Sequence, residues 1–373
     1  MKRIKMVPSL ALALIMAMTL AACGEGSGTP AANAGSATDS APAAAAENIG
    51  TSGKVYELNM ACHDPSTAGQ AAVLDQWVAG LEEASGGRLK ITIYYGGSLG
   101  GPRDEVNLVE TGAVDLCWNA TAHNPNRFNT AEALCLPMIG IENGMQGTAA
   151  LLDLYEDVPE IKEEFSIFKT VAVHLNALVP ISTNKKLESA PDFSGLRLRT
   201  GVPYAIQWLE QMGANGMSFA ISDSYENISK NVADGLLNDW NNLNANKLYE
   251  VVDYVLDINV GAPIGFVAMN WDTYNSLPSD LQELIDGTFK ELSFDLAEAF
   301  ANGRIAGLDM ALEYNTEVYT PSAELEASML EAAETVKSNW LATLREAGVN
   351  GKETLQILQQ KLEKYAEEYA SYN

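Results

Sequence analysis

Apolar and polar residues alternate in two short stretches, 56–60 and 89–93, and each stretch predicts a β-strand. Between them, residues 67–84 carry apolar side chains at helical spacing, with Leu74, Trp77 and Leu81 on one face. Further strands are predicted at 114–118 and 168–173, and further helices at 102–110 and 145–156. Strands and helices that alternate in this way predict α/β layers joined by βαβ crossovers.

A much longer helical pattern follows in the C-terminal part of the chain. Apolar residues recur at helical spacing through 279–314, which as one helix would reach roughly 50 Å, more than one small domain needs. Gly287, Gly303 and Gly307 lie inside this pattern and are candidate points for a bend or a break. Two more helices are predicted at 323–346 and 352–370.

The N-terminus has the layout of a secretory signal peptide. Three basic residues within the first five precede an apolar run, which ends in Leu-Ala-Ala-Cys at Cys23. The run is too short to be a good membrane-spanning helix. This ending resembles the lipobox of bacterial lipoproteins, which implies cleavage after residues 1–22 and a lipid on Cys23. Ordinary cleavage near Ala22, with Cys23 incidental, is the alternative.

Residues 23–53 are mostly Gly, Ala, Ser, Thr, Pro and Asn, and they predict a flexible linker between the lipid anchor and the folded part. The whole chain of 373 residues has 23 Lys+Arg against 49 Asp+Glu, a formal charge of −26. This acidity argues against sequence-independent binding to nucleic acid or to anionic lipid. The protein is therefore expected outside the cytoplasm, held at the membrane by lipid rather than by a spanning helix.

Three cysteines remain beyond Cys23, namely Cys62, Cys117 and Cys135. An odd number cannot all pair with one another, and no CxxC spacing is present. A bridge between Cys117 and Cys135 and three buried free thiols are both compatible with the sequence.

One segment of the chain matches a motif of hydrolytic enzymes. Residues 96–100, Gly-Gly-Ser-Leu-Gly, satisfy GxSxG and lie between a predicted strand and a predicted helix, as a nucleophile elbow does. A hydrolase of that class needs a histidine late in the chain, but only His123 and His174 follow Ser98. A glycine-rich loop whose Ser98 hydroxyl faces a ligand cleft explains the pattern better.

Sequence motifs for nucleotide, zinc-hydrolase and EF-hand sites are absent from the chain. The three histidines have no second metal ligand at short spacing. The sequence therefore predicts no cofactor and no metal site.

A series of short motifs covers residues 181–282. Gly195-Leu-Arg-Leu-Arg199 predicts a strand that ends in arginine, and Ala233-Asp-Gly235 predicts a tight turn with Asn238 shortly after it. Lys247-Leu-Tyr-Glu-Val251 and Leu277-Pro-Ser-Asp-Leu-Gln282 follow in the same order. Upstream, the Leu99–Arg103 loop and the segment Thr111–Leu116 belong to the same series.

Together these motifs resemble the solute-binding component of tripartite ATP-independent periplasmic (TRAP) transporters, over essentially all of 54–373. The resemblance implies an α/β fold of two lobes, like a type II periplasmic binding protein, with a long helix across both lobes. It divides the chain into lobe I, 54–176 with 264–303, and lobe II, 177–263 with 304–373.

The resemblance also implies the ligand contacts. In that family, the arginine that ends this strand binds a ligand carboxylate, a role that falls on Arg199 here, and Asn238 matches an asparagine that contacts ligand oxygen. The planar guanidinium suits a two-point contact with a carboxylate. Because the chain is so acidic, an anionic ligand also needs a local positive centre.

The remaining pocket residues are predicted to be Trp118, Asn119, Trp240, His63 and Ser98. Sialic-acid-binding members have a second arginine where this chain has Val179, and an acidic residue where it has Ala120. Sialate is therefore disfavoured, and a simple monocarboxylate, aromatic acid or keto acid fits better.

The predicted function is a receptor, and not an enzyme, that captures a small organic acid and delivers it to the membrane permease of a TRAP transporter. A binding lipoprotein of an ATP-driven importer would share the export signal, the linker and the two lobes. The Ser98 hydrolase is the remaining alternative.

Overall fold

The computed structural model describes residues 53–372. The predicted signal peptide, the lipidation site Cys23 and nearly all of the linker lie outside these described residues. Within residues 53–372, no helix combines the length and the apolar character that crossing a membrane requires.

The first sheet has five strands in the order β2-β1-β3-β10-β4. Its first three strands are parallel, while β10 runs antiparallel to both β3 and β4. The strands are β1 (Tyr56–Cys62), β2 (Leu89–Tyr94), β3 (Leu116–Ala120), β4 (Lys169–Leu175) and β10 (Ile264–Met269). The four strands predicted in this region are confirmed, and β10 joins them from nearly 90 residues further along the chain.

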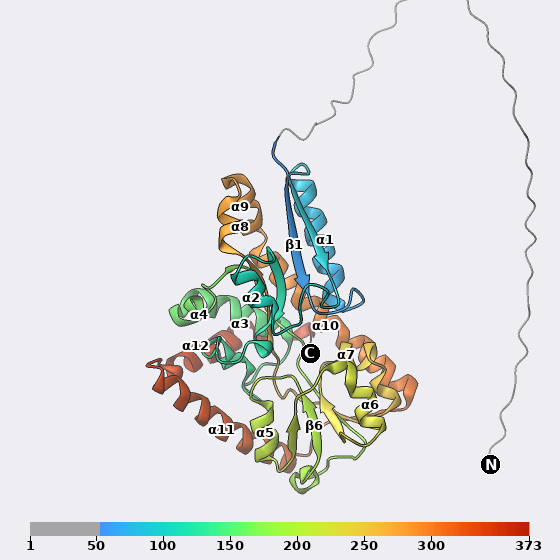
Figure 1. The fold of residues 1–373 in the computed structure, drawn as a ribbon. Coiled ribbons are helices and arrows are strands. Elements are labelled where there is room, and N and C mark those ends of the chain that lie inside the picture. The colour runs from blue at the N-terminus through green and yellow to red at the C-terminus, as the bar shows by residue number, and fades with distance from the viewer. Residues whose placement is uncertain (1–52, 373) are drawn as a thin grey trace, which may run out of the picture. The chain divides into compact units, whose positions relative to one another are not determined.

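The second sheet has six short strands in the order β11-β9-β5-β8-β6-β7. Strand β6 runs parallel to its neighbours β7 and β8, whereas β5 is antiparallel to β8 and β9. The strands are β5 (Ile181–Thr183), β6 (Arg197–Thr200), β7 (Asn215–Met217), β8 (Gly235–Leu237), β9 (Tyr254–Leu256) and β11 (Glu317–Tyr319). Two mixed sheets with their helices confirm the predicted two-lobed α/β fold (Figure 1).

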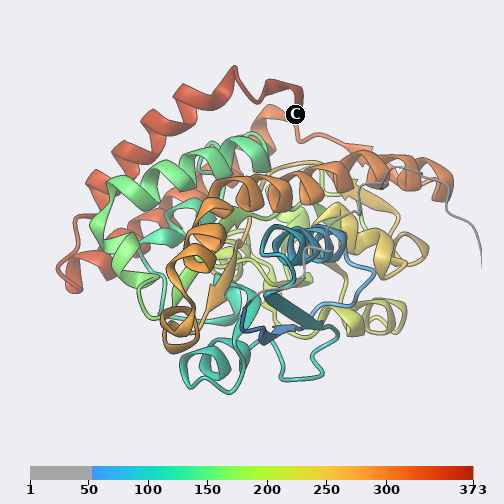
Figure 2. The same cartoon turned by 90° about the horizontal axis from the view of Figure 1, so that it is seen from above.

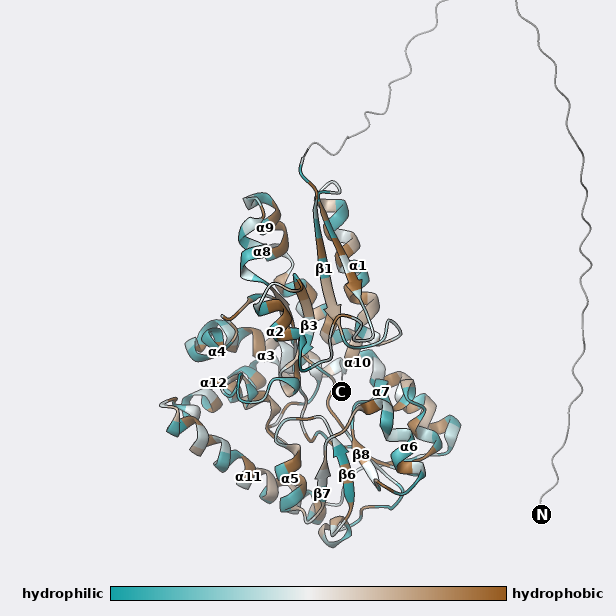
Figure 3. Ribbon diagram, viewed as in Figure 1, coloured by the Kyte–Doolittle hydropathy of each residue, from teal (hydrophilic) through white to brown (hydrophobic). Residues whose placement is uncertain are grey.

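Helices cover both sheets. Those of the first sheet's region are α1 (Gly69–Ala84), α2 (Glu105–Glu110), α3 (Gly144–Asp157), α4 (Pro159–Glu164), α8 (Trp271–Ser276) and α9 (Ser279–Gly287). Those that follow strands of the second sheet are α5 (Ala205–Gln211), α6 (Ser224–Ser229) and α7 (Trp240–Ala245). Helix α9 shows a polar and an apolar side in Figure 3, because Leu281 and Ile285 face the core.

The helical pattern at 279–314 forms two helices rather than one. Helix α9 ends at Gly287, and α10 (Phe289–Tyr314) begins after Thr288. Helix α10 packs against α1, α3 and β4 on the first sheet, and against α7 and β11 on the second. It extends along the molecule in Figure 2 and confirms the predicted helix across both lobes.

Gly303 and Gly307 do not break α10. A Cβ atom at Gly303 would lie 2.0 Å from Asn241 Oδ1, and one at Gly307 would lie 2.7 Å from Trp240 Cβ. The two glycines therefore let α10 approach α7 closely, which a larger residue would prevent.

The last two helices, α11 (Ala323–Glu346) and α12 (Gly351–Ala366), match their predicted positions closely. Helix α11 packs on α5, whereas α12 packs on α3, where Gln146 Nε2 donates a hydrogen bond to the Leu362 carbonyl at 3.0 Å. The residue boundaries of the two lobes stay a prediction. For α12 we propose lobe I in place of lobe II, because its main contacts are with α3.

The three cysteines of the folded part are free and buried. Of the two states that the sequence left open, the structure therefore has buried thiols. They fill small apolar positions in the core, and burial raises the pKa of each, so that they stay uncharged.

Candidate functional site

Arg199 lies near the end of β6 and is partly buried. Its Nε donates a hydrogen bond to the Phe219 carbonyl at 3.1 Å, and its Nη1 donates to Asn238 Oδ1 at 2.8 Å. Burial lowers the pKa of the guanidinium to about 10, against the opposing charge of Asp239. Within residues 53–372, Arg199 forms no ion pair, so the site holds a charged, desolvated cation without a carboxylate partner.

The neighbouring arginine on the same strand is paired instead. Arg197 donates from Nε and Nη2 to the carboxylate of Asp234, at 3.0 and 2.8 Å, and its backbone N–H donates to the same group at 2.8 Å. The two side chains are two positions apart and leave β6 on the same face, but they reach different ends of β8. Arg197 secures the turn before β8, and Arg199 contacts Asn238 directly after it. The two arginines of the sequence motif thus have separate roles.

Asn238 and Asp239 link β8 to α7. Asp239 caps the helix: its Oδ1 accepts from the Asn242 backbone N–H at 3.0 Å, and its Oδ2 accepts from Asn242 Nδ2 at 2.7 Å. Burial raises the pKa of Asp239, and these hydrogen bonds oppose the shift. The cap fixes the backbone beside Asn238 and so orients the amide oxygen that meets Arg199.

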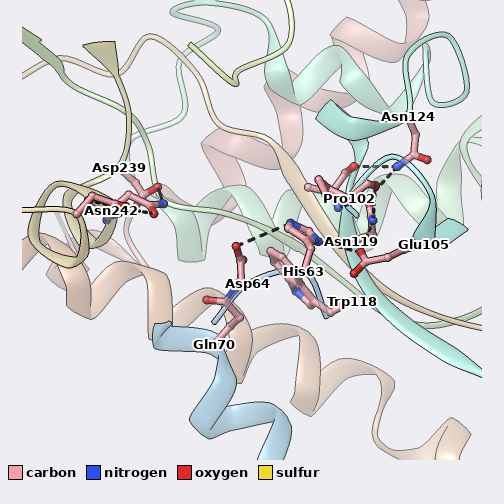
Figure 4. Close-up of polar contacts among 12 residues, drawn as sticks. His63, Asp64, Gln70, Pro102, Glu105, Trp118, Asn119, Asn124, Asp239 and Asn242 are labelled. Carbon is pink, nitrogen blue, oxygen red and sulfur yellow. Dashed lines mark hydrogen bonds and ion pairs between the residues drawn. The ribbon is translucent and has the colours of Figure 1, made fainter. Parts of the chain in front are cut away.

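A second polar cluster lies in the first lobe. Glu105 Oε2 hydrogen-bonds His63 Nδ1 at 2.8 Å and accepts from Asn119 Nδ2 at 2.6 Å. Asn119 Nδ2 also lies 2.9 Å from the Pro102 carbonyl. These residues come from the end of β1, from α2 and from β3. Figure 4 shows them beside Asp64, with Asp239 and Asn242 further away on the same side as Asp64.

Burial and hydrogen bonding shift the pKa values of Glu105 and His63 in opposite directions. Burial raises the pKa of Glu105, while the hydrogen bonds from His63 and Asn119 lower it. At His63, burial opposes the charged form, but the hydrogen bond to Glu105 and the charges of Asp64 and Glu105 together raise the pKa. The pair therefore retains a proton more readily than free histidine and glutamate would.

His123 lies in the 3₁₀ turn Thr121–His123, directly after β3. Its ring meets the His63 ring edge-on, with 4.8 Å between the centroids. Burial lowers the pKa of His123 to about 3, and the charges of His63, Arg199 and Arg103 act in the same direction. His123 is therefore neutral near pH 7.

The two tryptophans predicted as pocket walls are each only 2 % exposed. Trp118 packs against the His63 ring at 5.4 Å between centroids and donates from Nε1 to His174 Nε2 at 3.2 Å. Trp240 begins α7 and carries Arg304 over its ring at 5.7 Å. Both support residues of the site from the core, and Trp240 also lines a cavity of about 240 Å³ against α10.

Ser98 is exposed, and its Oγ donates to the Tyr95 carbonyl at 3.1 Å, within its own loop. Of the predicted site residues, Arg199 therefore contacts Asn238, while His63 packs on Trp118 and shares Glu105 with Asn119. Ser98 has no hydrogen bond to either of these two groups. Sequence reasoning missed Glu105 and Asp239. Glu105 resembles any solvated carboxylate in the first turn of a helix, and only the glycine-rich loop before it could have drawn attention to it.

Comparisons with known proteins show the family of the chain. Residues 58–370 match the family described as bacterial extracellular solute-binding protein, family 7. A C4-dicarboxylate-binding periplasmic protein of Vibrio cholerae is 26% identical over 32% of this chain and 36% of its own length. A sialic acid-binding periplasmic protein of the same organism is 27% identical over 46% of this chain and 54% of its own. The chain thus spans about half or less of these relatives.

Among solved structures, a TRAP solute binding protein from a marine metagenome, specific for aromatic acid ligands and bound to 3-hydroxybenzoate, superposes with a TM-score of 0.77. It is 24% identical and covers 84% of this chain and 99% of its own, a likeness that concerns the fold. The family match extends over both sheets and over the strand that carries Arg199. The chain belongs to the bacterial extracellular solute-binding proteins of family 7.

Proposed function

We propose that this protein is the extracytoplasmic receptor of a TRAP transporter, that it binds a small organic acid, and that it delivers the acid to the membrane permease. The observation that carries the proposal is Arg199, a partly buried cation that has hydrogen bonds but no ion pair within the described residues. A ligand carboxylate would supply the missing charge in a two-point contact, and Asn238 would hold the guanidinium in place.

Closure around the ligand would be a hinge motion between the lobes. Two segments that join the sheets pair with each other, since the Asn176 N–H donates to the Pro263 carbonyl at 3.0 Å and the Val179 N–H to the Gly261 carbonyl at 3.2 Å. Helix α10 is the third connection. A ligand that contacts both lobes would favour the closed arrangement by its additional contacts there.

The chain is proposed to act without catalysis. The Ser98 hydroxyl bonds within its own loop, and no histidine of residues 53–372 hydrogen-bonds to it. A receptor that binds its ligand through the partly buried Arg199 explains the site more fully than a hydrolase does.

A thermal-shift screen tests the receptor function. The protein is heated with and without monocarboxylates, dicarboxylates, aromatic acids and keto acids. A ligand at 100 times its dissociation constant adds about 2.7 kcal/mol to the unfolding free energy, which for a folded part of this size raises the melting temperature by about 4 °C. Neutral amides of the same acids are the control and are expected to give no shift. If no carboxylate moved the melting temperature, the proposal would be contradicted.

We also propose that Cys23 carries the lipid that holds the receptor at the membrane. The Cys23→Ala variant is expected to move the protein from the membrane fraction to the soluble extracytoplasmic fraction, because the acyl chains supply the membrane affinity. Immunoblots of both fractions measure this. The Cys62→Ala variant is the control, since Cys62 is a buried core thiol, and it is expected to stay with the membranes. Retention of the Cys23→Ala variant at the membrane would exclude the lipid anchor.

A further inference from the structure

Two buried polar atoms near the proposed ligand site have no hydrogen-bond partner. They are Glu105 Oε1 and His123 Nδ1. The Glu105 residue is 0 % exposed, and its other oxygen already hydrogen-bonds His63 and Asn119. A buried polar group without a partner is destabilising, so a fold that keeps two of them calls for an explanation.

The two atoms belong to one cluster. His63 hydrogen-bonds Glu105 at 2.8 Å and meets the His123 ring at 4.8 Å between centroids, so it lies between them. The cluster also lies near the second lobe. His63 Nε2 is 3.8 Å from the Asp64 carboxylate, which accepts a hydrogen bond from Gln70 at the start of α1. A Cβ atom at the adjacent Gly69 would lie 3.8 Å from Asn241 Nδ2 in α7. A ligand whose carboxylate binds Arg199 would therefore extend toward Glu105 and His123.

The chemistry of the two atoms selects what can bind there. An ionised Glu105 accepts hydrogen bonds but cannot donate them, and a neutral His123 can donate from one ring nitrogen. A hydroxyl group fits both, because it donates to the carboxylate and accepts from the imidazole. A second carboxylate would be repelled by Glu105, and a methylene group would leave both atoms unpaired.

We infer that Glu105 and His123 form a hydroxyl-binding subsite opposite Arg199, and that the ligand is a hydroxy-substituted carboxylic acid. This inference rests on the proposed receptor function and narrows its substrate class. His63 acts as a positioning residue, since its bond to Glu105 Oε2 leaves Oε1 free for the ligand.

Matched pairs of acids test the inference. Calorimetry on the full-length protein compares 3-hydroxybenzoate with benzoate, and 4-hydroxybutyrate with butyrate, with succinate as the dicarboxylate. The hydroxylated member of at least one pair is expected to bind about tenfold more tightly or better, because its deoxy partner leaves the polar atoms unpaired. Succinate is expected to bind more weakly than that hydroxy acid.

Two variants test whether the preference for hydroxylated acids comes from Glu105 and His123. His123→Phe keeps a ring against His63 and removes both nitrogens, and Glu105→Gln keeps the shape and removes the charge. Both are expected to bring the affinity ratio of the matched pair to about one. Asp115→Asn is the control, because Asp115 lies before the opposite end of β3, where it accepts from the Asn59 N–H at 2.8 Å. This variant is expected to keep the wild-type ratio.

The outcomes separate the two proposals. Equal affinities within both pairs, or a preference that persists in both variants, would overturn the hydroxyl subsite while the receptor function stands. A purely structural cluster would lower the melting temperature of the variants without changing the ratio, which also overturns it. If none of the acids binds, both the subsite and the receptor function are contradicted.

Discussion

The Arg199→Ala variant is expected to lose at least tenfold in affinity for the organic acid while it keeps its fold. Truncation of one partner of a buried charged pair costs roughly 2–5 kcal/mol, and about 1.4 kcal/mol already corresponds to tenfold. Removal of the guanidinium also removes a desolvated cation that forms no ion pair within residues 53–372, so the unliganded protein should be destabilised little. Calorimetry of the ligand found by the thermal-shift screen, together with thermal unfolding, measures both effects.

Two further variants make the result specific. Arg199→Lys keeps the charge but cannot form the two-point contact, and it is expected to bind more weakly than the wild type. Arg197→Ala changes the same residue type two positions away, where the side chain pairs with Asp234. It should keep the wild-type affinity. Unchanged binding by Arg199→Ala would remove this residue from the ligand site.

Gly235→Ala is expected to destabilise the second lobe by about 3 kcal/mol or more, as severe overpacking does. A Cβ atom at Gly235 would lie 2.1 Å from the Ser182 carbonyl oxygen and 3.0 Å from the Thr183 Cα atom. Both atoms belong to the backbone of β5, which pairs with β8. The backbone cannot yield without breaking the sheet that also pairs β8 with β6, the strand of Arg199.

Urea denaturation measures the effect as a lower midpoint. Gly80→Ala is the matched control, and its expected change in stability has the opposite sign. A Cβ atom at Gly80, within α1, would meet nothing within 4 Å, and alanine is favoured over glycine in a helix by about 1 kcal/mol. This variant is expected to be slightly more stable than the wild type. A Gly235→Ala protein that unfolds at the wild-type urea concentration would contradict the close approach of β5 and β8.

The motif around Gly235 shows what a short sequence motif can predict about the fold. Ala233-Asp-Gly235 predicted a turn, and the structure gives its residues separate physical reasons. Asp234 binds Arg197, and Gly235 lets β5 approach. The order of these motifs along the chain was enough to identify the family and the two-lobed fold, because each motif depends mainly on local backbone geometry.

The break at Thr288 was less predictable. The apolar spacing continues through 279–314 without interruption, and three glycines offered equal places for a break. Helix α9 ends at Gly287, where a Cβ atom would meet nothing within 4 Å. Helix α10, in contrast, continues through Gly303 and Gly307, where α7 packs closely. Tertiary contact therefore decided which glycine ends a helix.

The sequence alone determined four strands of the first sheet, the longer helices, the acidic character of the chain, and the strand that carries Arg199. These features follow from local periodicity, composition and motif order. Only the tertiary structure decided the chemistry opposite Arg199, where His63, Glu105, Asn119 and His123 meet from three separate segments. Their contacts arise because β1 and β3 pair side by side and α2 packs on β3, and no local pattern along the chain encodes that proximity.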